Sequence, residues 1–410
     1  MKEYKYIIIG GGTTAGYTAK ELVEQGLEKN ELCIISAEST LPIDRPPLSK
    51  DFFTDDEMKV DDIVINPQEF YDSHGIEIKL NEKAKTVDLK NKHVELEGGK
   101  KLKYEKLLLA TGSKLRTLPV KGSELKNIFY LRTAEHSQKI RKAAEDAEKI
   151  VVIGGQYIGT EMGSSLKKLG KEVTMVFPED RLLSKFSTAD IAGFLHNYFH
   201  EKGVEMIHNK TVTGFEGDGK VEKVLLEPDG SIEADMVVAG IGVEPNTEIV
   251  EGTAIAQEDG IVVNEYLETN KPGVFAAGDV AKFPDNIFKK MRRVEHWENA
   301  YEQGTHAARI LTGQRKPYSF LPFFFSDIFD LGYEYFGDSE KADTNFIRGD
   351  LAEGDFSSWW FNGDKLVAAF IMASRPEEEG KMAREWITEQ ETLHKKKISD
   401  TKTKLENIIK

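Results

Sequence analysis

Cysteine is almost absent from the sequence: one, Cys33, occurs in 410 residues. A single thiol excludes an internal disulfide, a Cys-x-x-Cys redox pair, and a zinc or iron–sulfur site built from the thiolates of one chain. Because Cys33 falls within a predicted strand, we expect it to be a buried packing residue rather than a reactive group. No metal site is predicted.

Long apolar runs and an excess of basic charge are also lacking. The longest apolar runs, such as residues 366–373, fall far short of the roughly 20 residues that cross a bilayer. The N-terminus alternates charged and apolar residues, unlike a signal peptide. The chain has 55 Lys and Arg against 70 Asp and Glu, a net charge of −15, which disfavours nucleic acid as a partner. We therefore expect a soluble, cytoplasmic protein without a membrane span.

An internal near-repeat is the strongest organisational signal. The run Tyr-Ile-Ile-Ile-Gly-Gly-Gly-Thr-Thr-Ala-Gly at residues 6–16 returns as Ile-Val-Val-Ile-Gly-Gly-Gln-Tyr-Ile-Gly at residues 150–159. In each copy an apolar run meets a glycine cluster and then a helical pattern, and a second strand follows at residues 32–36 or 173–177. These are two βαβ beginnings, which are typical of a doubly wound nucleotide-binding fold.

The order of the segments predicts an α/β fold with two Rossmann-like domains, one inserted in the other, and a small α+β C-terminal domain. We expect the first domain to comprise residues 1–114 and 245–324, the inserted domain residues 115–244, and the last domain residues 325–410. A polar helix is predicted after Glu377, and it would include the basic tract at residues 394–397 as a solvated face.

The first glycine loop has the features of a dinucleotide site. Gly10 permits a tight turn, Gly12 lets a pyrophosphate approach the backbone, and Ala15 allows close packing of helix on strand. Glu38 follows Gly16 by 22 residues, which is near the spacing at which a carboxylate accepts a hydrogen bond from a ribose hydroxyl. The alternative is that Glu38 only caps a surface loop.

The second loop departs from the pattern at its middle glycine, which is Gln156. A side chain at this point either weakens dinucleotide binding or shifts the pose of the dinucleotide. Glu179 follows Gly159 by 20 residues and favours NADH through the 2′-hydroxyl of the adenosine ribose. Arg181 leaves NADPH open as the alternative.

Three further segments carry a family resemblance. They are Arg-Pro-Pro-Leu-Ser-Lys at residues 45–50, Thr-Asn-Lys-Pro-Gly-Val-Phe-Ala-Ala-Gly-Asp at 269–279, and Val-Glu-His-Trp at 294–297. Together they resemble the FAD-dependent NAD(P)H reductases of ferredoxins and rubredoxins, within the pyridine nucleotide-disulfide oxidoreductase superfamily. Residues 10–13, 177–179 and 332–334 are more similar to the apoptosis-inducing-factor branch. The resemblance extends over nearly the whole chain.

This resemblance implies FAD in the first domain and the nicotinamide dinucleotide in the inserted one. Asp279 would accept hydrogen bonds from the ribityl chain, Arg45 would contact the pyrophosphate, and Trp297 would stack on the flavin ring. The implied FAD contacts are Gly10, Gly12, Thr13, Ala15, Glu38, Arg45, Lys50, Ala84, Thr111, Gly112, Asp279, Glu295, His296, Trp297 and Phe325. The implied NAD contacts are Gly154, Gln156, Tyr157, Ile158, Gly159, Glu161, Glu179 and Gly242.

Lys50 and Glu161 are the catalytic residues that the resemblance implies, as an ion pair beside the flavin N5. The alternative is that neither residue is catalytic: Lys50 would be an exposed lysine in a proline-rich loop, and Glu161 a glutamate in the first turn of a helix. Phe325 stands where family members usually carry a tryptophan in an aromatic-Phe-Trp-Ser-Asp motif, so the ring is retained but the indole N–H is lost.

The sequence thus predicts hydride transfer from NADH, with NADPH as the alternative, to FAD. Because no second thiol is present, electrons must leave to an external acceptor, such as a ferredoxin, a rubredoxin or a similar small carrier, a quinone or oxygen. The second hypothesis is a slow NADH oxidase like apoptosis-inducing factor that acts as a redox-responsive partner-binding protein. The basic residues 289–293 are the predicted dock for an acidic carrier. The chain is expected to be a monomer or a homodimer.

Overall fold

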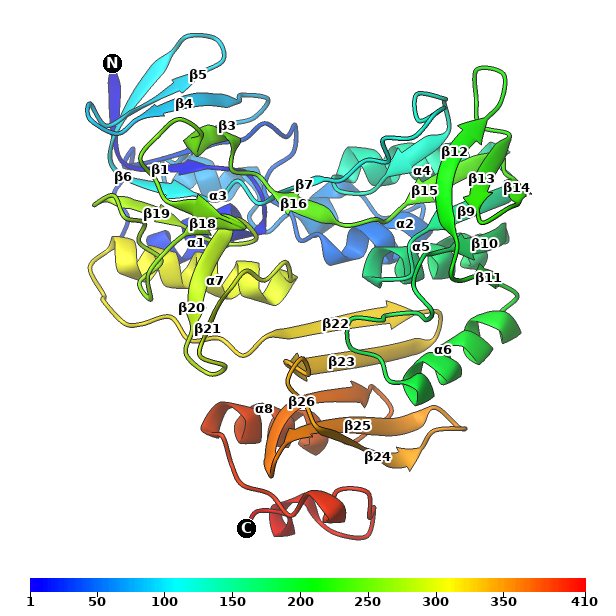
Figure 1. Cartoon of the computed structure of the whole chain (residues 1–410). Coiled ribbons are helices and arrows are strands. Elements are labelled where there is room, and N and C mark those ends of the chain that lie inside the picture. Colours follow the sequence, from blue (N-terminus) through cyan, green and yellow to red (C-terminus); the bar gives the residue numbers. More distant parts are fainter. The chain divides into compact units, whose positions relative to one another are not determined.

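The computed structural model describes all 410 residues, and contacts between them divide the chain into two compact units (Figure 1). Unit 1 contains residues 1–46, 59–114 and 243–322. Unit 2 contains residues 47–58, 115–242 and 323–410. This grouping does not test the predicted division into three domains, which stays a prediction. None of the helices is long and apolar enough to span a bilayer.

The main sheet of unit 1 grows from the N-terminal strand. Its strands are β1 (Lys2–Ile9), β2 (Leu32–Ile35), β3 (Glu77–Lys79), β4 (Ala84–Asp88), β5 (His93–Leu96), β6 (Lys101–Leu109) and β19 (Val274–Ala276). Their order is β3-β2-β1-β6-β5-β4, with β19 paired to β6. Strands β1, β2, β3, β6 and β19 pair in parallel, so their carboxyl ends share one edge of the sheet. Cys33 is fully buried in β2, as predicted.

Two helices of unit 1 pack unusually closely. Helix α1 (Thr13–Glu24) follows the first glycine loop, and α7 (Trp297–Leu311) lies beside it (Figure 1). A Cβ added to Gly304 would lie 2.6 Å from the carbonyl oxygen of Thr14, so only glycine permits this approach. The hydroxyl of Thr18 donates to the carbonyl of Gly304 at 3.0 Å. This contact fixes α7 against α1, the helix that follows the glycine loop.

The remaining elements of unit 1 are short. They include α3 (Gln68–Ser73) and a four-stranded sheet of β17 (Gln257–Glu258), β18 (Gly260–Val262), β20 (Ala281–Asp285) and β21 (Lys290–Arg292). Where the chain leaves and re-enters the unit, β7 (Ser113–Leu115) pairs with β16 (Val243–Pro245).

Unit 2 contains a second parallel sheet, in the order β11-β10-β9-β15-β8. Its strands are β8 (Ile128–Tyr130), β9 (Lys149–Ile153), β10 (Glu172–Val176), β11 (Glu205–Ile207) and β15 (Met236–Ala239). Its helices are α4 (Ala134–Asp146), α5 (Tyr157–Lys168) and α6 (Ala189–Glu201). The three strands β12 (Thr211–Glu216), β13 (Lys223–Glu227) and β14 (Ser231–Glu233) form a small antiparallel sheet. The predicted βαβ beginning after residue 150 is confirmed.

An antiparallel sheet, β22-β23-β26-β25-β24, completes unit 2. Its strands are β22 (Phe323–Ile328), β23 (Leu331–Gly337), β24 (Thr344–Asp350), β25 (Asp355–Asn362) and β26 (Lys365–Met372). Helix α8 (Glu377–Glu389) covers it. The prediction that this helix includes residues 394–397 is wrong. Gln390 adopts a left-handed conformation (φ 57°) that ends the helix, and Lys395–Lys397 form a separate 3₁₀ turn.

Aromatic side chains join the two halves of unit 2. Tyr157 of α5 contacts Phe324 of β22, with ring centroids 4.4 Å apart, and Phe186 lies 4.7 Å from Tyr335. Such pairs contribute beyond the apolar area that they bury. The short helix α2 (Asp51–Thr54) adds two fully buried rings, Phe52 and Phe53. Helix α2 contacts both α4 and α5.

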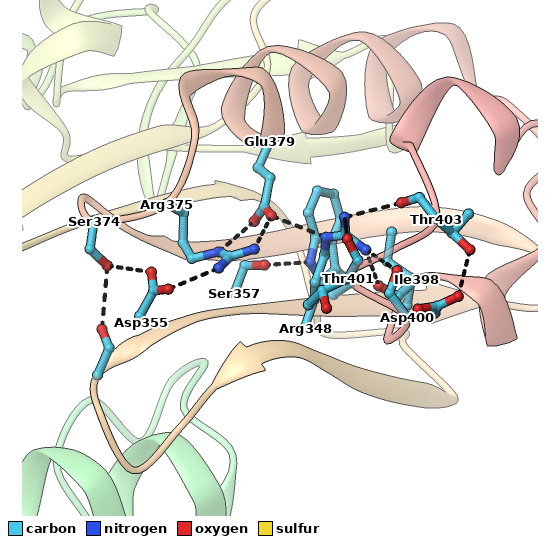
Figure 2. Close-up of polar contacts among 12 residues, drawn as sticks. Arg348, Asp355, Ser357, Ser374, Arg375, Glu379, Ile398, Asp400, Thr401 and Thr403 are labelled. Atoms are coloured by element: carbon cyan, nitrogen blue, oxygen red, sulfur yellow. Dashed lines mark hydrogen bonds and ion pairs between the residues drawn. The ribbon is translucent and has the colours of Figure 1, made fainter.

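The C-terminal segment is held by a buried arginine (Figure 2). The guanidinium of Arg348 donates to the carboxylate of Glu379 at 3.1 Å. It also donates to four backbone carbonyls, those of Ile398, Asp400, Thr401 and Thr403. Arg375 approaches the same carboxylate at 2.6 Å, so both guanidinium groups share Glu379. One side chain thus satisfies the carbonyls of an irregular segment.

Candidate active site

The first glycine loop provides a strained turn and an open helix end. Gly10 has φ +121°, and a Cβ there would lie 2.0 Å from the carbonyl oxygen of Ala110. Gly12, which precedes α1, has an ordinary φ of −90°, and a Cβ there would meet nothing closer than Arg45 Nη2 at 3.4 Å. The fold therefore requires the glycine at position 10 but not the one at position 12. The space above Gly12 suits a phosphate at the N-terminus of α1.

Four more of the predicted FAD contacts lie at or near this loop in unit 1. Arg45 Nη2 pairs with Glu38 Oε1 at 2.5 Å, so the predicted ribose acceptor and the predicted pyrophosphate contact are held together. Thr13 donates its hydroxyl to the carbonyl of Ile43 at 3.2 Å, and Ala15 is fully buried. The arrangement places a carboxylate and a guanidinium beside the open helix end.

Thr111, Gly112, Asp279 and Ala84 also belong to unit 1. Thr111 donates to the carbonyl of Asn246 at 2.7 Å, and Gly112 has φ +64°. Asp279 is 9% exposed and directly follows the turn after β19. Ala84 opens β4, opposite Leu96. The first three lie in turns after parallel strands, where the fold class places its ligands.

Gln303 was not predicted from the sequence. This residue of α7 is fully buried, and its Oε1 accepts from the backbone N–H of Gly278 at 2.8 Å. Its Nε2 is buried without a hydrogen-bond partner. A buried amide donor next to the turn that carries Asp279 indicates a missing acceptor. A helical glutamine has no sequence signal that would have identified it.

Trp297 is oriented by a carboxylate. Its indole N–H donates to Asp44 Oδ1 at 2.6 Å, and its ring stacks on Tyr301 with centroids 5.8 Å apart. Burial raises the pKa of Asp44, although hydrogen bonds from Trp297 and Tyr17 oppose the shift. His296 immediately precedes α7, and Glu295 pairs with Arg293 at 2.5 Å. Asp44 lies just before the recognised motif, and its role was not predicted.

The second glycine loop, in unit 2, repeats the first. Gly154 has φ +121°, and a Cβ on Gly159 would lie 1.9 Å from the carbonyl oxygen of Gly154. Gln156 Nε2 donates to Ser184 Oγ at 2.9 Å and lies 3.5 Å from Glu179 Oε1. Of the remaining predicted positions, Tyr157 packs on Phe324, Ile158 is 36% exposed and Gly242 has φ +94°.

The predicted pair Lys50 and Glu161 is brought together within unit 2. Lys50 Nζ lies 3.5 Å from Glu161 Oε1 and 3.1 Å from Asp327 Oδ2. The carboxylate of Glu161 is almost completely buried, and it accepts hydrogen bonds from Ser49 at 2.5 Å and Ser326 at 2.6 Å. A buried charge with an ion-pair partner and two hydroxyl donors is well compensated.

Phe325 completes this cluster, since the ammonium of Lys50 lies 4.7 Å from the centre of its ring. The ring is 37% exposed, which is unusual for a phenylalanine. Ser165 of α5 donates to the carbonyl of Ser49 at 2.6 Å and fixes the backbone next to Lys50. Of these residues, Ser49, Ser326 and Asp327 lie inside the quoted motifs but were not predicted as functional.

Comparisons with known proteins identify the family of the chain. The profile of the pyridine nucleotide-disulphide oxidoreductases matches residues 4–304. The chain belongs to the pyridine nucleotide-disulphide oxidoreductase family. A reductase C-terminal profile matches residues 323–409. Monodehydroascorbate reductase 3 of Arabidopsis thaliana is 35% identical over 415 residues, which cover 93% of this chain and 92% of the relative. Monodehydroascorbate reductase of Pisum sativum is 35% identical and covers 94% of each chain.

Solved structures agree with the family over the full length. A ferredoxin reductase from Rhodopseudomonas palustris has a TM-score of 0.93 at 28% identity, with 98% of this chain and 99% of that chain covered. The covalent complex of putidaredoxin reductase with putidaredoxin has a TM-score of 0.93 at 30% identity, with 99% and 97% covered. The predicted fold class and family are confirmed. The chain is an FAD-dependent NAD(P)H oxidoreductase that passes electrons to an acceptor outside the chain.

The residues present fit these cofactors. In unit 1 the open space at Gly12 and the unpartnered amide of Gln303 suit a phosphate and a polar chain with acceptor oxygens. In unit 2 Gln156 Oε1 and Glu179 Oε2 are buried acceptors without partners, which suits a ligand with hydroxyl groups.

A reactive thiol is not part of the site. Burial, followed by the charge of Glu77, raises the pKa of Cys33 to about 12. The thiol therefore stays protonated and inert at neutral pH. This matches the prediction that Cys33 is a packing residue.

The two arginines of the predicted basic dock pair with carboxylates of unit 1. Arg293 pairs with Asp259 at 3.2 Å and with Glu295 at 2.5 Å, and Arg292 Nε lies 2.7 Å from the buried carboxylate of Asp285. The side chains of both arginines are only about one-tenth exposed, at 10% and 11%. Their charges are paired with internal carboxylates, so these two arginines add less positive charge to the surface of the stretch 289–293 than the sequence suggests.

Proposed function

We propose that the protein transfers a hydride from NADH to FAD and passes the electrons to a small external redox protein such as a ferredoxin or a rubredoxin. FAD, when bound, supplies the group that accepts a hydride and releases electrons. The observation that carries the proposal is the cluster of Lys50, Glu161 and Asp327 beside the exposed ring of Phe325.

In this proposal Lys50 supplies the positive charge next to the flavin, and Glu161 holds that charge in place. Two hydroxyl donors, Ser49 and Ser326, hold the carboxylate of Glu161 in its orientation. Because the ammonium is held by two carboxylates before any substrate arrives, its charge needs little reorganisation during the reaction.

We assign the FAD contacts predicted from the sequence to unit 1, except for Lys50 and Phe325, which belong to unit 2. The dinucleotide is assigned to the second glycine loop of unit 2. NADH is preferred over NADPH because Glu179, and not a basic side chain, reaches Gln156 at the end of that loop. We keep residues 1–114 with 245–324, 115–244 and 325–410 as the proposed domains, and the cytoplasm as the proposed compartment.

The acceptor is a small electron carrier in this proposal because two structural neighbours are reductases of ferredoxin and putidaredoxin. A small organic acceptor such as monodehydroascorbate is the second candidate. It is favoured by the 35% identity to the monodehydroascorbate reductases and by the ion pairs of the two arginines in the basic stretch.

An anaerobic titration tests the proposal. The yellow protein is mixed with NADH or NADPH, and then with oxidised ferredoxin, rubredoxin, monodehydroascorbate or oxygen. We expect NADH to bleach the flavin faster than NADPH does, and a redox protein to restore the colour fastest. Fast reoxidation by monodehydroascorbate alone would favour the second candidate. Slow bleaching with a persistent charge-transfer band would favour a slow oxidase like apoptosis-inducing factor. Failure of the protein to take up FAD would overturn all three.

A further inference from the structure

The side chain of Gln156 connects two parts of the second nucleotide site. Gln156 stands at the N-terminal end of α5, but its side chain makes no capping hydrogen bond to that helix. Its amide extends instead to the segment after β10, where Nε2 donates to Ser184 at 2.9 Å and approaches Glu179 Oε1 at 3.5 Å. The phosphate-binding turn and the carboxylate beyond β10 are therefore linked through one amide.

The backbone does not explain why a glutamine is present. Gln156 has φ −101° and ψ −166°, and Gly12 at the same place in the first loop has φ −90° and ψ −165°. Both conformations are open to any L-residue. The two loops thus have the same course, and the amide is an addition that only the second loop carries.

Polar atoms of this amide and of the segment after β10 are left unsatisfied. Gln156 Oε1, Glu179 Oε2 and Arg181 Nε are buried without a hydrogen-bond partner. Two of them are acceptors, and a vicinal diol offers two O–H donors. The guanidinium of Arg181 contacts Asp180 at 3.4 Å, so its charge is partly compensated. A phosphate placed next to Glu179 would instead meet a carboxylate, which opposes its binding.

We propose that Gln156 is a positioning and specificity-determining residue, which orients Glu179 toward the adenosine ribose and selects dinucleotides with an unmodified 2′-hydroxyl. This inference rests on the proposed function, because it assumes that the second loop holds NADH. It replaces both expectations for Gln156, a weakened site or a shifted pose, with a positive role in selection.

Equilibrium binding tests the role without turnover. Dissociation constants for NAD⁺, NADP⁺ and ADP-ribose are measured by calorimetry on the FAD-loaded protein and on Gln156→Ala, Glu179→Ala and the double variant. Loss of one hydrogen bond that orients a carboxylate predicts about five- to tenfold weaker binding of NAD⁺ and ADP-ribose to Gln156→Ala, with NADP⁺ changed less than about twofold. In the Glu179→Ala background the same substitution should have almost no further effect.

Gln390→Ala is the matched control, because Gln390 also stands at a helix end and donates to a nearby group, the carbonyl of Ile387 at 2.7 Å. Equal weakening of NAD⁺ and NADP⁺, additive effects of the two substitutions, or tighter binding of NAD⁺ by Gln156→Ala would each overturn the inference. If the unmodified protein binds none of the three ligands, the proposed function itself fails.

Discussion

Glu161 shows how a single carboxylate organises the site. Its two oxygens are shared among Lys50, Ser49 and Ser326, so its charge is the common acceptor of three donors. Replacing it by an uncharged isostere leaves Lys50 with Asp327 as its only described carboxylate partner.

We expect Glu161→Gln to slow flavin bleaching by NADH at least about tenfold, since a preorganised charge pair contributes that much or more to transition-state stabilisation. The rate is measured by anaerobic stopped flow. Asp330→Asn is the control, since Asp330 is an exposed carboxylate that pairs with Lys202 elsewhere in the unit. An unchanged bleaching rate in Glu161→Gln would contradict the role assigned to the pair.

Asp44 gives a prediction for pH dependence. Burial raises its pKa above the ordinary value of 3.8, so the folded state holds a proton more tightly than the unfolded state does. The resulting stability is present below the ordinary pKa and is lost as the pH rises through the folded-state pKa. Asp44→Asn lacks this titration. We therefore expect the melting temperature of the unmodified protein to fall relative to that of Asp44→Asn as the pH rises above the ordinary value of 3.8.

The indole emission of Trp297 provides a second readout of Asp44, because the two side chains are hydrogen-bonded. The emission should titrate over the same pH range in the unmodified protein and lose this step in Asp44→Asn. Parallel pH curves for the two proteins in both measurements would contradict a raised pKa.

At the level of elements, the packing of α1 on α7 depends on the absence of a side chain at Gly304. We expect Gly304→Ala to lower the free energy of unfolding by about 1–3 kcal/mol, because the new Cβ would lie 2.6 Å from a backbone oxygen. Gly193→Ala in α6 is the matched control. No atom lies within 4 Å of a Cβ there, so it should stabilise by roughly 0.5–1 kcal/mol. Thermal or urea unfolding measures both, and equal effects would contradict the close contact.

The C-terminal segment makes a second prediction at this scale. Arg348→Met removes five donated hydrogen bonds and leaves Glu379 with Arg375, so we expect a loss of about 3–5 kcal/mol (Figure 2). Amide hydrogen exchange should accelerate over residues 394–408. Lys381→Met, an exposed change on α8, the helix that carries Glu379, should leave exchange unchanged. Unaltered exchange in Arg348→Met would show that other contacts hold the segment.

At the scale of the whole molecule, net charge affects how fast the protein associates with a charged electron acceptor. The net charge is −15, and the arginines of the basic stretch pair with internal carboxylates. An acidic carrier is therefore repelled at long range, and we expect its second-order reduction rate to rise as salt screens this repulsion up to about 0.15 M. A neutral quinone serves as the control, with a rate that salt changes little. A rate that falls with salt would support the dock at residues 289–293.

The sequence by itself determined both glycine loops, their helices and the family. It did so because strand, turn and helix patterns depend on hydrogen bonds and steric limits between near neighbours. The identities of Lys50 and Glu161 came from the resemblance of their motifs to the family.

Only the tertiary structure decided what surrounds those residues. Ser49, Glu161 and Ser326 come from three distant segments, and their contacts arise from packing that no local pattern encodes. The same is true of Gln156. Its side-chain amide contacts Glu179, which lies beyond the end of the neighbouring strand β10. It also holds for Arg293, which forms an ion pair with Asp259, a residue distant from it in the sequence. Sequence spacing therefore specified the loops, whereas long-range packing determined which side chains within them meet.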